Sequence, residues 1–205
     1  MVVGLGAVTT TFMTGVLMAR KGLTKPVGSM CMYDKIRVGE GEDKKYLKYK
    51  DIVPIADLND IEFAAWDVYP ANAYESAINA EVLKEKDINP VREELEAIKP
   101  LKAAFDHNYA KRLDGDNVMT GKTRWEMVEA LREDIRKFKT EKNLNRVVVL
   151  WAASTEVYVP VNEKVHYHLA DLEAAMKADD KEHVAPSMCY AYAALVEGAP
   201  FIMGA

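Results

Sequence analysis

The stretch MVVGLGAVTT, residues 1–10, opens the sequence, and the order of its residue types decides the fold class. The apolar segment Met1–Val3 runs into two glycines one residue apart, and Val8–Lys21 then has the length and apolar spacing of a helix. This order predicts a strand, a tight turn and a helix. Because buried strands usually have about five or six residues, the short run before Gly4 predicts that part of the first strand lies upstream.

Further along the chain, apolar runs that are typical of strands alternate with segments of helical spacing. Strands are predicted at Val27–Met32, Ile61–Trp66, Arg146–Trp151 and Phe201–Met203. Helices are predicted at Ala71–Lys84 with Asn72 as its cap, Val91–Ile98, Thr123–Lys142, Asn162–Lys177 and Pro186–Glu197, with a further helical turn at Phe105–Arg112. The charged stretch Tyr33–Lys50 indicates a surface excursion without its own core. This alternation predicts an α/β fold, a Rossmann-like, doubly wound, mainly parallel sheet with helices on both faces.

Length and composition fit one globular domain over residues 1–205. The chain is 49% apolar and 29% charged, which is ordinary for a packed protein. Its net charge is −5 with both signs interspersed, so neither nucleic acid nor a membrane surface is predicted as a partner. Cys31 and Cys189 match no metal-ligand or redox spacing, which favours free thiols in a reducing cytoplasm. The first apolar run lacks a basic leader segment and is interrupted by glycines and threonines, unlike a signal peptide.

The pattern Gly4-x-Gly6-x-x-Thr9 is a partial dinucleotide-binding fingerprint, in which Thr9 stands where a third glycine is usual. Glycines let the backbone approach a pyrophosphate, and the amides and dipole at the start of a helix favour its negative charge. The strand before the glycines and the helix after them are the context that such a site needs. From the residues alone, a simple tight turn and a phosphate site both remain possible.

The acidic residue that holds a ribose in such folds usually lies about 20 positions after the glycines. Asp34 lies too far along the chain, and Asp67 closes a different predicted strand. We favour Asp67, because a carboxylate at a strand end can accept hydrogen bonds from ribose hydroxyls. A capping or surface aspartate remains the alternative. Trp151–Glu156 follows the strand predicted to be most buried, and its small and hydroxyl residues allow a cofactor or sugar to approach the backbone.

Other familiar chemistry has no support in the sequence. His166 and His168 are two residues apart on a predicted helix, so they point in different directions and favour a solvated pair over a shared metal. No metal site is predicted. Neither a nucleophile elbow nor a glycine-rich lysine loop occurs in the chain, so hydrolase and P-loop functions are not predicted.

Five segments together resemble the family of inositol-1-phosphate synthases. They are GLGAVTTTF (4–12), VGSM (27–30), WDVYPANAYESA (66–77), VVVLWAASTEVY (147–158) and APSMCYAYAALVEGAPFIMGA (185–205). They span the whole chain in the family's order, and the W-D pair, the L-W-x-A-x-T-E segment and the last run are specific to it. The resemblance implies an isomerase that converts glucose 6-phosphate to myo-inositol 3-phosphate by oxidation, enolisation, intramolecular aldol closure and reduction. NAD is reduced and reoxidised within one turnover.

The resemblance also implies roles for particular residues. It places the pyrophosphate of NAD against Gly4, Gly6, Ala7, Val8, Thr9 and Thr10. It implies that Asp67 holds the adenosine ribose. It places at the nicotinamide side Ala153, Ser154 and Thr155, with Ser187 and Tyr190 as further candidates.

The family's catalytic lysines and its oligomerisation sheet lie in segments downstream of Ala205 in the family's order. The chain is therefore expected to be an NAD-binding portion truncated at both ends, with no catalytic residue of its own. Alone it is expected to bind NAD weakly and to be inactive, while the parent enzyme is expected to be a cytoplasmic homotetramer. Two other functions remain open: an ordinary NAD(P)-dependent dehydrogenase that releases reduced cofactor, and a non-catalytic nucleotide-binding domain.

Overall fold

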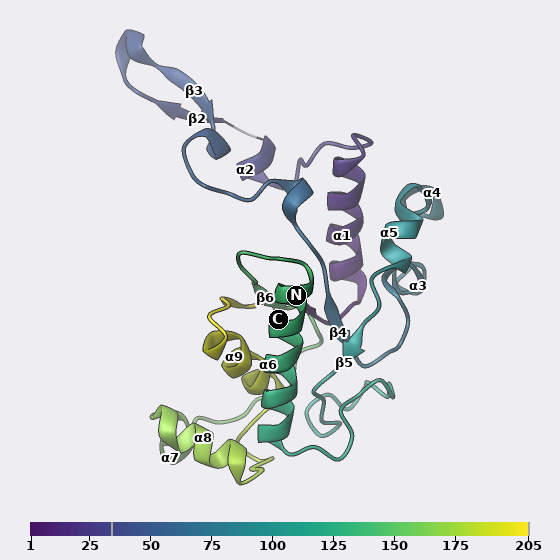
Figure 1. Cartoon of the computed structure of the whole chain (residues 1–205), viewed down its shortest axis with the longest axis vertical. Helices are drawn as coiled ribbons and strands as arrows, with labels where there is room; N and C mark the ends of the chain where they lie inside the picture. Colours follow the sequence, from purple (N-terminus) through teal and green to yellow (C-terminus); the bar gives the residue numbers. More distant parts are fainter. Residues whose placement is uncertain (34, 205) are drawn as a thin grey trace.

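A parallel five-stranded sheet organises the chain, of which the computed structural model describes residues 1–33 and 35–204 (Figure 1). The strands are β1 (Val2–Val3), β4 (Ala65–Asp67), β5 (Leu101–Lys102), β6 (Val149–Trp151) and β7 (Phe201–Met203). Their spatial order is β5-β4-β1-β6-β7, and every neighbouring pair is parallel. The chain thus winds outward from β1 in both directions, as in doubly wound Rossmann folds. The predicted fold class is confirmed.

Helices cover both faces of the sheet. One face carries α1 (Ala7–Arg20), α3 (Ala73–Asn79) and α5 (Arg92–Glu96), which contact one another. On the other face, α6 (Arg124–Glu141) packs along α9 (Pro186–Val196). The shorter helices are α2 (Met30–Tyr33), α4 (Glu85–Ile88), α7 (Glu163–His166) and α8 (Leu169–Lys177), with 3₁₀ turns η1 (Gly41–Asp43), η2 (Tyr49–Asp51), η3 (Leu58–Asp60) and η4 (Asn89–Val91). No helix within the described residues has the length and apolar character needed to cross a bilayer.

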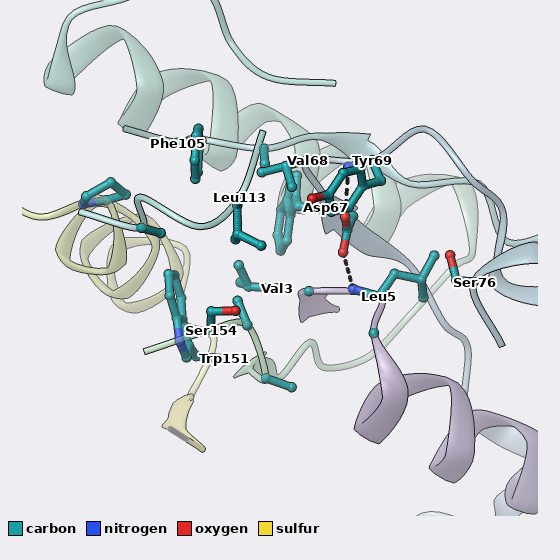
Figure 2. A pocket seen from close by; sticks show the side chains of 18 of the residues that line it. Val3, Leu5, Asp67, Val68, Tyr69, Ser76, Phe105, Leu113, Trp151 and Ser154 are labelled. Carbon is teal, nitrogen blue, oxygen red and sulfur yellow. Dashed lines mark hydrogen bonds between the residues drawn. The ribbon is translucent and has the colours of Figure 1, made fainter. Parts of the chain in front are cut away.

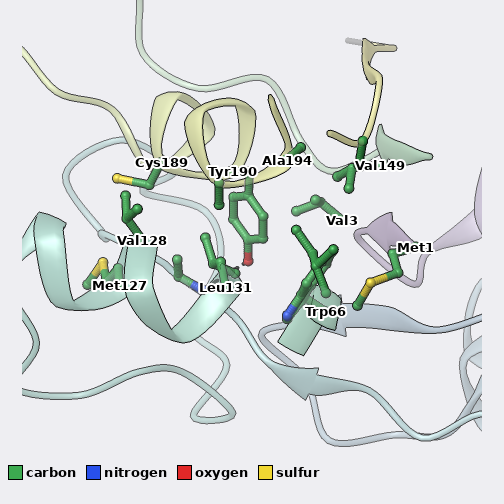
Figure 3. Close-up of a cluster of buried hydrophobic side chains, with 14 of the residues drawn as sticks. Met1, Val3, Trp66, Met127, Val128, Leu131, Val149, Cys189, Tyr190 and Ala194 are labelled. Atoms are coloured by element: carbon green, nitrogen blue, oxygen red, sulfur yellow. Dashed lines mark hydrogen bonds between the residues drawn. The ribbon is translucent and has the colours of Figure 1, made fainter. Parts of the chain in front are cut away.

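Successive strand residues supply two hydrophobic cores. Val2 and Ala65 belong to the core beneath α1, whereas Val3 and Trp66 belong to the core beneath α6 and α9. This follows from the two-residue period of a strand, and it explains why the strands are apolar at consecutive positions. Figure 3 shows the second core, where the Tyr190 ring projects from α9 toward Trp66.

Two helices begin at capping boxes that fix the start of each element. The Asn72 side chain accepts a hydrogen bond from the Glu75 amide, and the Glu75 carboxylate accepts one from the Asn72 amide, each at 3.0 Å. Thr123 and Glu126 form the same arrangement before α6. Each box satisfies amides that the first helical turn leaves unpaired. The prediction that Asn72 caps a helix is confirmed.

The α1–β4 connection, residues 21–64, differs from the expected course. The predicted strand Val27–Met32 is wrong: a turn and the short helix α2 occupy this segment, and Val27 is 69% exposed. An apolar run forms a strand only where a neighbouring strand can hydrogen-bond to its backbone, and this segment has no such neighbour among the described strands. The expected surface excursion is confirmed, but it contains an antiparallel hairpin of β2 (Lys35–Val38) and β3 (Lys45–Lys48), which projects from the sheet (Figure 1). Asp34, the rejected ribose candidate, lies outside the described residues.

Two further predictions are corrected in the second half of the chain. The segment Phe105–Arg112 forms turns and no helix. The helix predicted over Asn162–Lys177 is divided into α7 and α8 between His166 and Leu169. His166 is not a solvated partner of His168, because its Nε2 lies 2.9 Å from the His183 carbonyl oxygen and its Nδ1 accepts the Asn162 amide.

Candidate functional site

A cavity of about 540 Å³ opens at the carboxyl ends of β1, β4 and β6 (Figure 2). Its wall combines the glycine turn after β1, the residues after β4, the loop after β6 and part of α3. The remaining wall comes from the β5–α6 connection, residues 103–123. Ligands of doubly wound sheets bind beyond the carboxyl ends of the strands, at the point where the winding direction reverses. The cavity occupies that place.

Gly4 and Gly6 have different structural roles in this turn. Gly4 has a φ of +92°, and a Cβ added there would lie 2.7 Å from the Ala153 Cα, so a larger residue would clash with the loop after β6. Gly6 also lines the cavity, but a Cβ added there meets no atom within 4 Å. Gly4 therefore permits close packing, whereas Gly6 leaves empty space beside the start of α1.

Helix α1 begins at this turn without a side-chain cap, since Gly6 is its N-cap residue. The Thr10 amide makes the first bond back, to the Gly6 carbonyl at 3.0 Å, so the helical amides before it have no carbonyl partner within the helix, and Ala7 and Val8, which carry two of them, line the cavity. Thr9 and Thr10 are buried, and their hydroxyls donate to the carbonyls of Gly4 and Gly6. These two predicted contact residues brace the turn and do not line the cavity, whereas Ala7 and Val8 do line it.

Asp67 ends β4, the strand that pairs with β1 on the side away from β6. Among the strands of the parallel sheet, β4 is the second along the chain, so Asp67 ends the second strand. The long α1–β4 connection accounts for its large separation in sequence from the two glycines. Its Oδ2 accepts the Leu5 amide at 2.5 Å and its Oδ1 accepts the Tyr69 amide at 2.8 Å, as Figure 2 shows. Each carboxylate oxygen can accept more than one bond, so Asp67 ties the turn to β4 and can still accept from a ligand.

The loop after β6 divides its predicted site residues between two cavities. Ala153 and Ser154 line the large cavity, whereas Thr155 lines a neighbouring cavity of about 190 Å³. Glu156 lines both, and its carboxylate accepts bonds from the amide and hydroxyl of Ser187, the hydroxyl at 2.5 Å. Burial raises the pKa of Glu156, although the bonds from Ser187 oppose that shift. Ser187 thus belongs to the smaller cavity.

Aromatic rings form the floor of the large cavity. The Tyr190 ring stands edge-on to Trp66 and Trp151, with centroids 5.3 and 5.7 Å away, and its hydroxyl accepts the Ala104 amide at 2.9 Å. The Trp66 indole donates to the Asp134 carboxylate at 2.8 Å. Burial raises the pKa of Asp134, and the bond from Trp66 partly offsets the effect. Of these residues, only Tyr190 was named as a candidate site residue from the sequence, through the family resemblance.

The β5–α6 connection reaches the cavity through a buried ion pair that the sequence did not reveal. Arg124 is 1% exposed, and its guanidinium bonds the Asp106 carboxylate at 2.6 Å and the Val184 carbonyl at 2.8 Å. Asp106 lines the cavity. Burial alone would raise the pKa of Asp106, but the bonds from Arg124 and the Asn108 amide bring it below its ordinary value. Arg124 looked like one of many surface charges on a long helix.

Comparisons with known proteins agree with this geometry. A family model of an NAD-binding domain, described as Myo-inositol-1-phosphate synthase, matches residues 1–205. The chain belongs to this family. The resemblance seen in the sequence is thereby confirmed, and NAD is the cofactor of the domain. The space beside Gly6, the open start of α1 and the mainly apolar wall fit a dinucleotide.

Individual synthases match over nearly the whole chain. Inositol-3-phosphate synthase 1 of Bacteroides thetaiotaomicron is 58% identical over 100% of this chain and 47% of its own length. Inositol-3-phosphate synthase 1 of Oryza sativa subsp. japonica is 33% identical over 95% of this chain and 41% of its own. The crystal structure of inositol-3-phosphate synthase from Caenorhabditis elegans superposes with a TM-score of 0.88 at 28% identity, covering 98% and 42% of the two chains. This chain thus spans about half the length of the curated relatives it matches.

Proposed function

We propose that this chain is the NAD-binding half of an inositol-3-phosphate synthase that converts glucose 6-phosphate to myo-inositol 3-phosphate. The observation that carries the proposal is the convergence of three segments on one cavity: the glycine turn, the Asp67 strand end and the loop after β6. The names of the relatives that match nearly the whole chain support the activity. The parent enzyme is proposed to be a cytoplasmic homotetramer, and the two free thiols, Cys31 and Cys189, suit a reducing compartment.

Each wall segment has a defined part in this proposal. The amides of Ala7 and Val8 bind the diphosphate, because they open a helix whose dipole favours anions. Asp67 accepts hydrogen bonds from the adenosine ribose, and the loop carrying Ala153 and Ser154 orients the nicotinamide end. When bound, NAD supplies reversible hydride transfer to and from the sugar. We further propose that the lysines that stabilise the enolate belong to the half of the synthase outside residues 1–205, and we therefore expect this chain alone to be inactive.

The diphosphate position is tested by a matched pair of glycine substitutions, one at the N-cap of α1 and one within the helix. A Cβ added at either Gly6 or Gly15 meets no atom within 4 Å, but only Gly6 lines the cavity. We expect Gly6→Ala to weaken NAD binding by about ten- to a hundredfold, because the methyl group occupies the space of the diphosphate. Gly15→Ala is expected to leave the affinity unchanged. Calorimetric titration with NAD measures both, and equal affinities would place the diphosphate elsewhere.

The activity is tested with a chimera. Residues 1–205 replace the matching segment of the Bacteroides thetaiotaomicron relative, with which they are 58% identical. We expect the chimera to form inositol phosphate from glucose 6-phosphate and NAD without accumulating NADH, because the cofactor is reoxidised in each turnover. Accumulating NADH would favour a dehydrogenase. A folded chimera that binds NAD but turns nothing over would favour a non-catalytic nucleotide-binding domain.

A further inference from the structure

The β6 loop, residues 152–157, is fastened near both of its ends. At its start, the Ala152 amide donates to the Val3 carbonyl at 2.9 Å, and Ala153 packs against Gly4. At its far end, the Val157 amide donates to the Tyr109 carbonyl at 2.9 Å. Of the three residues between these anchors, Glu156 is half-buried, whereas Ser154 and Thr155 are exposed. Their positions therefore depend on how firmly the residues on each side are held.

Glu156 supplies the remaining anchor next to Thr155. Its carboxylate accepts the Ser187 amide at 3.1 and 3.3 Å and the Ser187 hydroxyl at 2.5 Å. Ser187 is the second residue of α9, an eleven-residue helix, so the negative charge lies at the positive end of the helix dipole. Ser187 is itself buried. Charge-assisted bonds of this kind are about twice as strong as neutral ones, which makes Glu156 a strong local constraint.

We propose that Glu156 is a positioning residue that, through Ser187, fixes the part of the β6 loop that receives the nicotinamide half of the cofactor. The inference rests on the proposed function and deepens it. The adenosine half is held by different segments, the glycine turn and Asp67, which are tied to each other through the Leu5 amide. Loss of the Glu156 anchor therefore weakens contacts to one half of the dinucleotide and leaves the other half unaffected.

The test compares NAD with ADP, which carries the adenosine and diphosphate but no nicotinamide. Glu156→Gln and Ser187→Ala are each expected to weaken NAD binding about tenfold and to leave ADP binding unchanged, because a charge-assisted bond is lost. The double variant is expected to bind NAD no more weakly than Glu156→Gln, since both changes break the same anchor. Glu163→Gln, at the exposed start of α7, is the control and is expected to bind both nucleotides as the wild type does.

Each outcome is informative. A parallel loss of NAD and ADP affinity would show that Glu156 supports the whole site, and unchanged NAD affinity would show that it positions nothing; both overturn the proposal. Additive losses in the double variant would overturn the route through Ser187. Should Glu156→Gln fail to fold, Ser187→Ala still decides between a selective and a general loss. A wild-type chain that binds neither nucleotide would instead refute the proposed function.

Discussion

The α1–β4 connection and the β5–α6 connection both leave the sheet for a long excursion, but they are held in opposite ways. The first forms regular structure, the β2–β3 hairpin, whose residues pair mainly with each other and are largely exposed. Its two ends are tied down: Lys21 bonds the Pro90 carbonyl and Glu94, and the Arg20 guanidinium bonds the carbonyls of Leu58 and Ile61. The second has little regular structure, yet the buried Arg124 bonds its Asp106, and the Asn117 amide group donates to the Asp67 carbonyl.

The difference shows that regular secondary structure does not decide which excursion builds the site. The two strands of the hairpin pair with each other in a sheet separate from the five-stranded one. The β5–α6 connection satisfies its polar groups against the sheet edge and the helices beyond it, so its residues lie in fixed places along the cavity wall. Loops positioned by a rigid scaffold commonly carry function. The bonds to Arg124 and Asp67 hold the β5–α6 connection in place, so that its residues form part of the cavity wall.

The largest difference is expected between Arg124, which holds the β5–α6 connection from the start of α6, and Arg37, which lies within the α1–β4 connection. Arg124→Met removes the cationic partner of the largely buried Asp106 and leaves its carboxylate with the Asn108 amide alone, which we expect to cost about 3–5 kcal/mol in the free energy of unfolding. Arg37→Met, in the exposed strand β2, is expected to change it by less than about 0.5 kcal/mol. Urea denaturation of the two variants measures both values. Similar losses would mean that the ion pair does not anchor the β5–α6 connection.

A smaller contrast is expected from two glycines with no unusual φ. A Cβ added at Gly115 would lie 2.2 Å from the Val68 carbonyl oxygen, so Gly115→Ala must displace the backbone beside Asp67 and is expected to cost about 1–3 kcal/mol. A Cβ added at Gly28 meets no atom within 4 Å, and Gly28→Ala is expected to be nearly neutral. Thermal unfolding compares the two. A neutral Gly115→Ala would show that the β5–α6 connection can move away from β4 at little cost.

The smallest effect concerns pH and the carboxylate beneath the cavity floor. Burial raises the pKa of Asp134, so its ionisation opposes folding, and the wild type loses stability as the pH rises through that pKa. In Asp134→Asn the amide oxygen still accepts the Trp66 indole proton without becoming charged. We expect its Tm to exceed that of the wild type by less than about 4 °C at pH 7, with no gain once the wild-type carboxyl is protonated in acid.

The control for this prediction is Glu42→Gln, at an exposed position of the α1–β4 connection, which is expected to leave the Tm unchanged at both pH values. Thermal melts at neutral and acid pH measure both variants. A lower Tm for Asp134→Asn at neutral pH would mean that the charged carboxylate binds the indole strongly enough to outweigh its desolvation.

Local signals in the sequence were sufficient for much of the fold. The glycine turn, the helix that follows it and the Asn72 cap depend on residues within a few positions of one another, and all three are present. Asp67 was found because strand ends are readable from apolar runs, even though its spacing from Gly6 is unusual. Asp67 lies beside the glycine turn because β4 pairs with β1. This adjacency is a property of the topology, which the number of residues between Gly6 and Asp67 does not reveal.

The anchors of the site were not readable, because their partners are far apart in the sequence. Asp106 and Arg124 are separated by 18 positions, and Glu156 and Ser187 by 31. In the sequence, each of these residues resembles an ordinary polar residue of a protein surface. Only the packing of α6 and α9 brings the two members of each pair together. The wrong strand at Val27–Met32 has the same origin, since an apolar run becomes a strand only where a neighbour can pair with it.

The aromatic floor gives the chain an optical property. Of its three tryptophans, Trp66 and Trp151 line the cavity, whereas Trp125, in the first turn of α6, packs near Tyr192 and beneath the Lys177 ammonium. Indole emission depends on the surroundings of the ring, and two of the three indoles lie against the cavity. Both rings are buried from solvent but lie against the cavity, so a bound nucleotide would change the surroundings of two of the three indoles, and occupancy can be followed by intrinsic fluorescence without a label.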